Sequence, residues 1–130
     1  MNEIILEKSD VVYIAGPMSG KPLYNYPAFY ALAGLVEKIF GCKVLNPARQ
    51  PDGLSYEEYM RRALMDVNEA TAVIMLNGWT ESRGACQEWN RASDLHLKIY
   101  YEPEIIARME LELRTANPSI SDGGAENETL

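Results

Sequence analysis

Short apolar runs alternate with longer amphipathic stretches along this chain. The runs are rich in β-branched and aromatic residues and end near glycine, asparagine or proline, which predicts β-strands. They lie at residues 10–16, 43–45, 71–76 and 98–101. Strands that are apolar at nearly every position are buried on both faces, as in a parallel sheet covered by helices.

The stretches between and after these runs carry the signals of helices. After Pro27, apolar residues recur every three or four positions up to a natural stop at Gly41. Ser55 and Glu58 form the capping box of a second helix. The predicted helices run from near 25–27 to 41, over about 56–69, over about 83–95 and over about 103–114.

This alternation predicts an α/β fold, a small doubly wound parallel sheet of four to five strands with helices on both faces. Right-handed crossovers give the strand order 2-1-3-4. Ligands of such folds bind beyond the carboxyl ends of the strands, where the order reverses. We therefore expect the site in the loops 16–22, 46–54 and 77–84.

Length and charge narrow the possible functions. The chain has 130 residues, which predicts one domain over 1–116, followed by an acidic tail over 117–130 that we expect to be disordered. The net charge is −7, and seven acids and two arginines within 101–130 supply −5 of it. This balance argues against a nucleic-acid polymer as partner, while a small anionic ligand remains possible.

The expected compartment is cytoplasmic. Two cysteines make no disulfide framework, and the first residues do not resemble a signal peptide. No apolar run is long enough to span a bilayer, so no membrane partner is expected. The few cysteines and the single histidine cannot build a zinc site, and no metal is predicted.

The loop after the first strand reads Gly16-Pro17-Met18-Ser19-Gly20-Lys21-Pro22. It fits neither the P-loop, which needs four residues between Gly and Gly-Lys, nor the dinucleotide fingerprint. It is either a turn that needs permissive glycines or a backbone cradle for a small ligand. Its place at the switch point favours the cradle.

The segment 77–88 leaves a strand and enters a helix. Ser82 is a suitable N-cap, and free N–H groups there would suit an anion. Glu88 follows about two turns later on a face of small or apolar residues that includes Gly84 and Ala92. A carboxylate on such a face is partly desolvated, as in functional sites. The alternative is a carboxylate at the edge of the stripe, paired with Arg91.

Other polar and aromatic residues allow two interpretations each. Asp66 lies near the end of the second helix, where an acid opposes the helix dipole, and it is either functional or a solvated charge. Tyr13 and Trp79 lie near strand ends and would either stack on a planar base or pack in the core. Tyr24, Tyr26 and Phe29 are further candidates for stacking.

Taken together, several of these segments resemble the nucleoside 2-deoxyribosyltransferase-like proteins. The segments are 12–20, 25–29, 46–48, 75–79 and 82–85, together with Glu88. The similarity covers about residues 10–101 and is greatest to a branch common in bacteriophages and prophages. It implies the same small doubly wound fold.

The resemblance implies an enzyme that cleaves the N-glycosidic bond of 2′-deoxynucleosides. Glu88 matches the family's nucleophile, which attacks the anomeric carbon and forms a deoxyribosyl-enzyme. That intermediate passes to water or to another base. No metal or organic cofactor is needed, and relatives are homo-oligomers, so a dimer or larger assembly is expected.

The spacing from Ser82 to Glu88 also resembles the deoxynucleoside 5′-monophosphate N-glycosidases, in which the matching serine helps to hold the 5′-phosphate. A nucleoside or nucleotide is thus the implied small-molecule partner. The implied substrate-binding residues are Tyr13, Gly16, Pro17, Met18, Ser19, Gly20, Asn46, Gly78, Trp79, Ser82 and Gly84.

One position departs from the family. An aspartate that assists the leaving base is expected near Ala63, and Asp66, one turn later, is the candidate acid/base in its place. The departure keeps a second hypothesis open, a non-catalytic nucleotide-binding module or sensor of the same fold. A third hypothesis is that the acidic tail recruits a basic partner.

Overall fold

A computed structural model describes residues 3–116 of the chain. Four strands form one parallel sheet in the order β2-β1-β3-β4, which confirms the predicted order. The strands are β1 (Val11–Ala15), β2 (Lys43–Leu45), β3 (Ala72–Met75) and β4 (Lys98–Tyr101). The predicted acidic tail at 117–130 lies outside the described residues.

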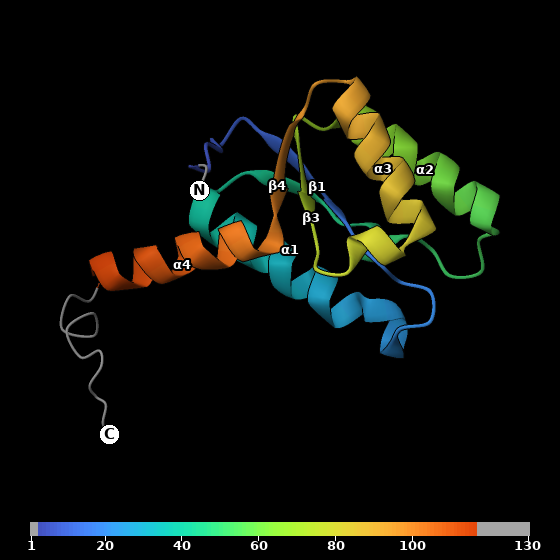
Figure 1. Cartoon of the computed structure of the whole chain (residues 1–130), viewed down its shortest axis with the longest axis horizontal. Helices are drawn as coiled ribbons and strands as arrows, with labels where there is room; N and C mark the ends of the chain where they lie inside the picture. The colour runs from blue at the N-terminus through green and yellow to red at the C-terminus, as the bar shows by residue number, and fades with distance from the viewer. Residues whose placement is uncertain (1–2, 117–130) are drawn as a thin grey trace.

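Two helices cover each face of the sheet (Figure 1). One face packs against α1 (Tyr26–Phe40) and α4 (Glu102–Ala116), and the other against α2 (Tyr56–Glu69) and α3 (Arg83–Asp94). The far end of α4 extends beyond the sheet (Figure 1). The small doubly wound α/β fold predicted from the sequence is therefore correct.

Alternate residues of the central strands enter two separate cores. Val12 and Ile14 pack under α1 and α4, whereas Tyr13 and Ala15 pack under α2 and α3. This explains why β1 is apolar at every position, since both of its faces are covered. Of the β1 residues, Tyr13 is the one that brings a side-chain polar group into the second core, and a buried hydroxyl needs a hydrogen-bond partner.

The predicted helix boundaries hold closely. Gly41 ends α1 with a φ of 70°, which favours glycine, and Ser55 and Glu58 form both bonds of the capping box at the start of α2. Ser82 caps α3 by accepting a hydrogen bond from the Ala85 amide at 3.1 Å. Only α4 runs clearly beyond its predicted length.

One local departure lies just before α1. Residues Leu23, Tyr24 and Asn25 have φ values of 52°, 51° and 62°, so three consecutive non-glycine residues adopt left-handed backbone. Each such residue costs about 1 kcal/mol. The Asn25 side chain stabilises the turn by donating to the Pro17 carbonyl at 2.9 Å. The turn connects the loop after β1 to α1.

Among the helices within residues 3–116, none has both the length and the apolar character to cross a membrane.

Candidate active site

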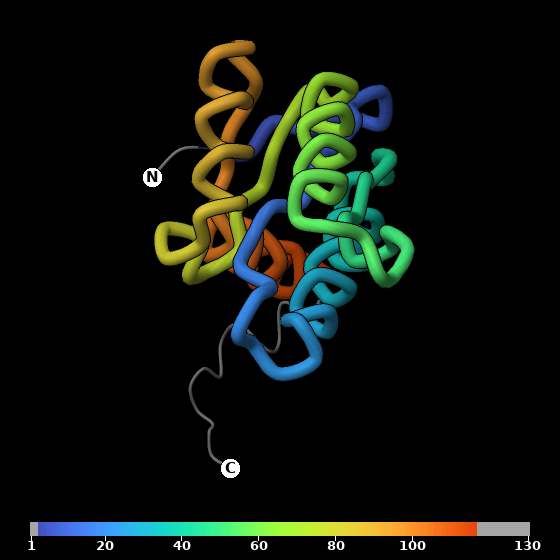
Figure 2. The backbone as a smooth tube through the Cα atoms, turned by 90° about the vertical axis from the view of Figure 1, so that its right-hand side faces the viewer, coloured from blue at the N-terminus to red at the C-terminus, as the bar shows by residue number. Residues whose placement is uncertain are grey.

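A pocket of about 1140 Å³ opens where β1 and β3 end. Its walls come from the loop after β1, residues 51–54, and the first turns of α2 and α3. Figure 2 shows the blue loop after β1 between the yellow start of α3 and the green segment that leads into α2. Parts of all three loops predicted from the sequence therefore meet, in a cavity large enough for a nucleotide-sized ligand.

Glu88 lies at the inner end of this pocket, on the second turn of α3. It is only 3% exposed, and its Oε2 atom accepts a hydrogen bond from the Tyr13 hydroxyl at 2.6 Å. Burial raises the pKa of Glu88 to about 8, although the hydrogen bond from Tyr13 acts in the opposite direction. The alternative pairing with Arg91 does not form, because Arg91 donates to Asn68 at 2.8 Å instead.

The Tyr13 hydroxyl fixes the position of the Glu88 carboxyl group by donating a hydrogen bond to it. Its side chain is fully buried in the core under α2 and α3, and it does not line the pocket. Burial first, and then the negative charge of Glu88, raise the pKa of Tyr13 well above its ordinary value. The phenol therefore stays protonated and donates, which fixes the direction of the carboxyl group. Of the two interpretations of Tyr13, packing in the core and not stacking on a base is the one that the structure shows.

The loop after β1 forms the floor of the pocket. Gly16, Pro17, Met18 and Ser19 line it as predicted, while Gly20 turns the loop with a φ of 80° and is not part of the lining. A Cβ atom at Gly16 would lie 2.7 Å from the Leu76 Cβ, so only glycine fits there.

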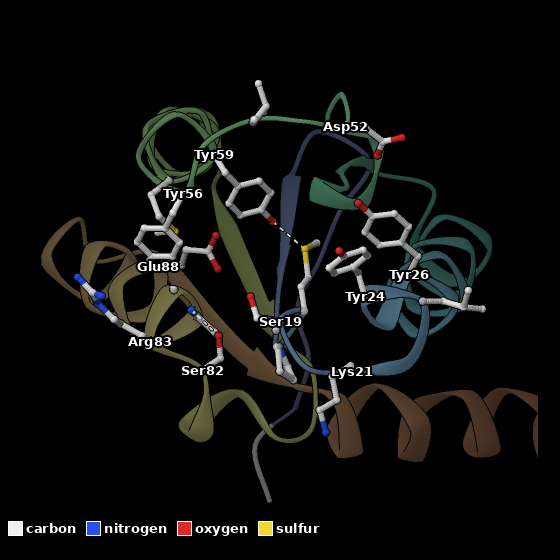
Figure 3. Close-up of a pocket in the computed structure, with 18 of the residues that line it drawn as sticks. Ser19, Lys21, Tyr24, Tyr26, Asp52, Tyr56, Tyr59, Ser82, Arg83 and Glu88 are labelled. Atoms are coloured by element: carbon white, nitrogen blue, oxygen red, sulfur yellow. Dashed lines mark hydrogen bonds between the residues drawn. The ribbon is translucent and has the colours of Figure 1, made fainter.

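The start of α3 forms the polar end of the pocket. Ser82 and Gly84 line it, together with the acid Glu81 and with Arg83, whose guanidinium lies 5.2 Å from the centre of the Tyr56 ring. Lys21 lines the pocket from the loop after β1 (Figure 3). A Cβ atom at Gly84 would lie 3.1 Å from the Met60 sulfur, so the glycine lets α2 and α3 approach closely. Backbone N–H groups at a helix N-terminus beside cations are suited to an anionic group.

Besides Tyr13 and Gly20, three further predicted binding residues lie outside the pocket lining. Trp79 stacks on Trp89 with ring centroids 5.9 Å apart and packs, half-buried, against the core under α2 and α3. Gly78 has a φ of 86° and begins the short turn that places Trp79 there. Asn46 is buried at the end of β2, where its side chain accepts from the Ala48 amide at 3.0 Å.

The candidate acid Asp66 is also outside the lining. It has one long contact, 3.5 Å from the Gln50 amide nitrogen, and burial followed by the charge of Glu69 raises its pKa. Ala63, at the expected aspartate position, is 1% exposed and packs in the core. No carboxylate of α2 therefore lines the pocket.

Tyr59, which was not among the residues predicted from the sequence, lines the pocket from α2. Its hydroxyl donates to the Met18 sulfur at 3.2 Å, and burial followed by the charge of Glu88 raises its pKa. The available signal was its spacing, because Tyr59 lies four residues before Ala63 and so on the same helix face. On the opposite wall, Tyr24 and Tyr26 pack with ring centroids 6.0 Å apart (Figure 3).

Within residues 3–116, the histidine, cysteine and acidic side chains form no group of three that could hold a metal ion.

A family model described as a domain of unknown function, DUF4406, matches residues 10–101. This is the same span that carries the resemblance noted above, and it includes every strand and the pocket. No curated protein matches the sequence. The family description gives no activity, so the similarity to nucleoside 2-deoxyribosyltransferases remains a prediction.

Proposed function

This chain belongs to the DUF4406 family, and we propose that it cleaves the N-glycosidic bond of 2′-deoxynucleosides or their 5′-monophosphates. One observation carries the proposal. Glu88 is a nearly fully buried carboxyl group at the inner end of a nucleotide-sized pocket, held at 2.6 Å by Tyr13. Buried carboxyl groups with strongly shifted pKa values concentrate at functional sites.

The proposed chemistry is a double displacement. An ionised Glu88 oxygen forms a bond to the anomeric carbon C1′ while the bond from C1′ to the base nitrogen breaks, and its electron pair leaves with the base. Water or a second base then attacks C1′ and releases Glu88. A 2-deoxy sugar suits this path, because no electron-withdrawing 2-hydroxyl opposes the positive charge that develops at C1′.

The polar end of the pocket supports a 5′-phosphate as part of the substrate. The start of α3, with Ser82 and Gly84, offers N–H groups to a phosphate, and Lys21 and Arg83 offer positive charge. A phosphate bound there would direct the sugar towards Glu88, two turns further into the helix.

The proposed nucleophile must be ionised, and this makes the reaction dependent on pH. With a pKa of about 8, about a tenth of Glu88 is ionised at neutral pH. We expect kcat/KM to rise with pH until Glu88 is fully ionised. The Tyr13 hydrogen bond favours the ionised form and so limits the shift.

Release of free base, measured by chromatography, tests the proposal. The protein is incubated with each common 2′-deoxynucleoside and each 5′-monophosphate, with and without an acceptor base. Release of free base by the wild type, and none by Glu88→Gln, supports glycosidic cleavage. If the base is released only when an acceptor base is present, the protein is a transferase. No release by folded wild type from any substrate contradicts the proposal.

A specific observation favours one alternative, a nucleotide-binding module or sensor. Ala63 fills the position of the expected acid, and Asp66 does not line the pocket. A module of this kind would retain a nucleotide for hours without cleaving it. Recovery of intact nucleotide from the complex separates it from the enzyme.

We also propose that the protein forms a homo-oligomer and that its partner is a small molecule, a nucleoside or nucleotide. Measurement of the mass in solution by light scattering tests the oligomer.

A further inference from the structure

The hydroxyl group of Tyr59 faces the pocket, and the acceptor to which it donates a hydrogen bond within the protein is a weak one. The ring projects from α2, and the hydroxyl points into the pocket and donates to the Met18 sulfur at 3.2 Å (Figure 3). A thioether sulfur is a weak acceptor. A nitrogen or oxygen of a bound ligand would therefore be a better partner for this O–H group.

The position of Tyr59 relative to Glu88 suggests which part of a ligand it meets. Both side chains point into the same space, but they come from different helices, Tyr59 from α2 and Glu88 from α3 (Figure 3). The charge of Glu88 contributes to the raised pKa of Tyr59, so the two groups are within electrostatic reach. They are not hydrogen-bonded to each other, because Glu88 accepts from Tyr13 and Tyr59 donates to Met18.

We infer that Tyr59 donates a hydrogen bond to the leaving base and so replaces the missing acid of α2. The inference rests on the proposed function. Displacement at C1′ puts the nucleophile and the base on opposite sides of that carbon, with the base towards Tyr59 and the Tyr24 and Tyr26 rings. When the C1′–N bond breaks, its electron pair leaves with the base, and negative charge develops on a ring nitrogen or carbonyl oxygen. The hydrogen bond strengthens as this charge grows.

Tyr59 keeps its proton in this scheme. Burial, followed by the charge of Glu88, raises its pKa, so the phenol keeps its proton in the pH range in which Glu88 ionises. The departed base takes its proton from water. This role differs from that of a carboxylic acid, which would transfer its own proton, and it suits a helix that offers no carboxylate to the pocket.

Base release by Tyr59→Phe tests the inference, with Tyr30→Phe as the matched control. Tyr30 is an exposed residue of α1 outside the pocket lining, so its hydroxyl has no part in the proposed reaction. We expect Tyr59→Phe to lower kcat/KM about hundredfold to thousandfold, as for other single donors to a developing anion, and Tyr30→Phe to match the wild type. Thermal melting of all three proteins shows that they are equally folded.

The dependence on the leaving base separates this role from simple packing. Each protein is given two substrates with the same sugar, one carrying a base made more acidic by a halogen. The loss in Tyr59→Phe should be clearly larger for the less acidic base, because that base needs the hydrogen bond more. An equal loss on both substrates would show a packing effect and overturn the inference, and so would no loss at all.

The two possible failures are distinguishable. No release by the wild type refutes the proposed function, and the role of Tyr59 with it. Release by the wild type that disappears in Glu88→Gln but is unchanged in Tyr59→Phe leaves the proposed function in place and refutes the role of Tyr59 alone.

Discussion

Replacing Glu88 by Gln should make the protein more stable than the wild type at alkaline pH. The side chain is 3% exposed, and burial raises its pKa from 4.5 to about 8. A carboxyl group whose pKa is higher in the folded than in the unfolded protein contributes stability when the pH is below its unfolded-state pKa. That contribution is lost as the pH rises through its folded-state pKa. Glutamine keeps an acceptor for the Tyr13 hydroxyl and does not ionise, so the stability of Glu88→Gln should not fall in this way.

The size of the effect follows from the two pKa values. Between about pH 5 and about pH 9, ionisation of Glu88 should lower the free energy of unfolding of the wild type by about 4 kcal/mol relative to Glu88→Gln. About a third of this change, roughly 1.4 kcal/mol, falls between about pH 7 and about pH 9. Each step of about 1.4 kcal/mol corresponds to a tenfold change in the equilibrium constant of unfolding.

Urea unfolding at several pH values measures this difference, with fluorescence of the stacked Trp79 and Trp89 as the signal. Other titrating groups cancel, because both proteins carry them. A difference between wild type and Glu88→Gln that stays constant from about pH 5 to about pH 9 would refute the reasoning. It would mean that Glu88 ionises as in an unfolded chain, despite its burial.

Three further predictions concern the residues around Glu88 and the packing of the fold. Tyr13→Phe removes a hydrogen bond that lowers the pKa of Glu88, so the rise of kcat/KM should move to higher pH, and a move to lower pH would contradict this. Gly16→Ala forces a Cβ against Leu76 and should reduce the free energy of unfolding by about 2 kcal/mol in urea, whereas an unchanged midpoint would show that the loop can shift. Ser55→Ala should cost about 1 kcal/mol in the same assay, while Ser55→Thr, which keeps the cap, should cost less, and equal costs would contradict a capping role.

The fold was predictable because local signals and the apolar pattern agree. The run 10–16 is apolar at each central position, and the structure buries both of its faces. Gly41 and the pair Ser55 and Glu58 set helix ends through their own backbone chemistry, which does not depend on distant residues. The strand order followed from the handedness of crossovers.

The left-handed turn before α1 was not predictable in this way. Leucine and tyrosine rarely adopt a positive φ, so Asn25 is the one residue of 22–25 that favours it. The turn depends on a contact with another segment, the hydrogen bond from Asn25 to the Pro17 carbonyl.

The candidate site was predictable only in part. The buried face of α3 indicated Glu88, and the switch point indicated the loop after β1. The sequence did not show that Trp79 would turn into the core or that Asp66 would stay outside the pocket, since both depend on packing between elements. Tyr59 was missed for the same reason, because its partner Met18 lies 41 residues away in the sequence.

The central claim is that Glu88 forms a covalent bond to the sugar, and intact-protein mass spectrometry tests it most directly. The protein is incubated with a 2′-fluoro-arabino analogue of a substrate that it cleaves, because the electron-withdrawing fluorine slows the release of the glycosyl-enzyme. The account predicts a mass increase equal to the fluorinated sugar, with or without its phosphate, located on the peptide that contains Glu88 and absent from Glu88→Gln. Base release by the wild type that Glu88→Gln retains, with no sugar bound to either protein, would contradict it.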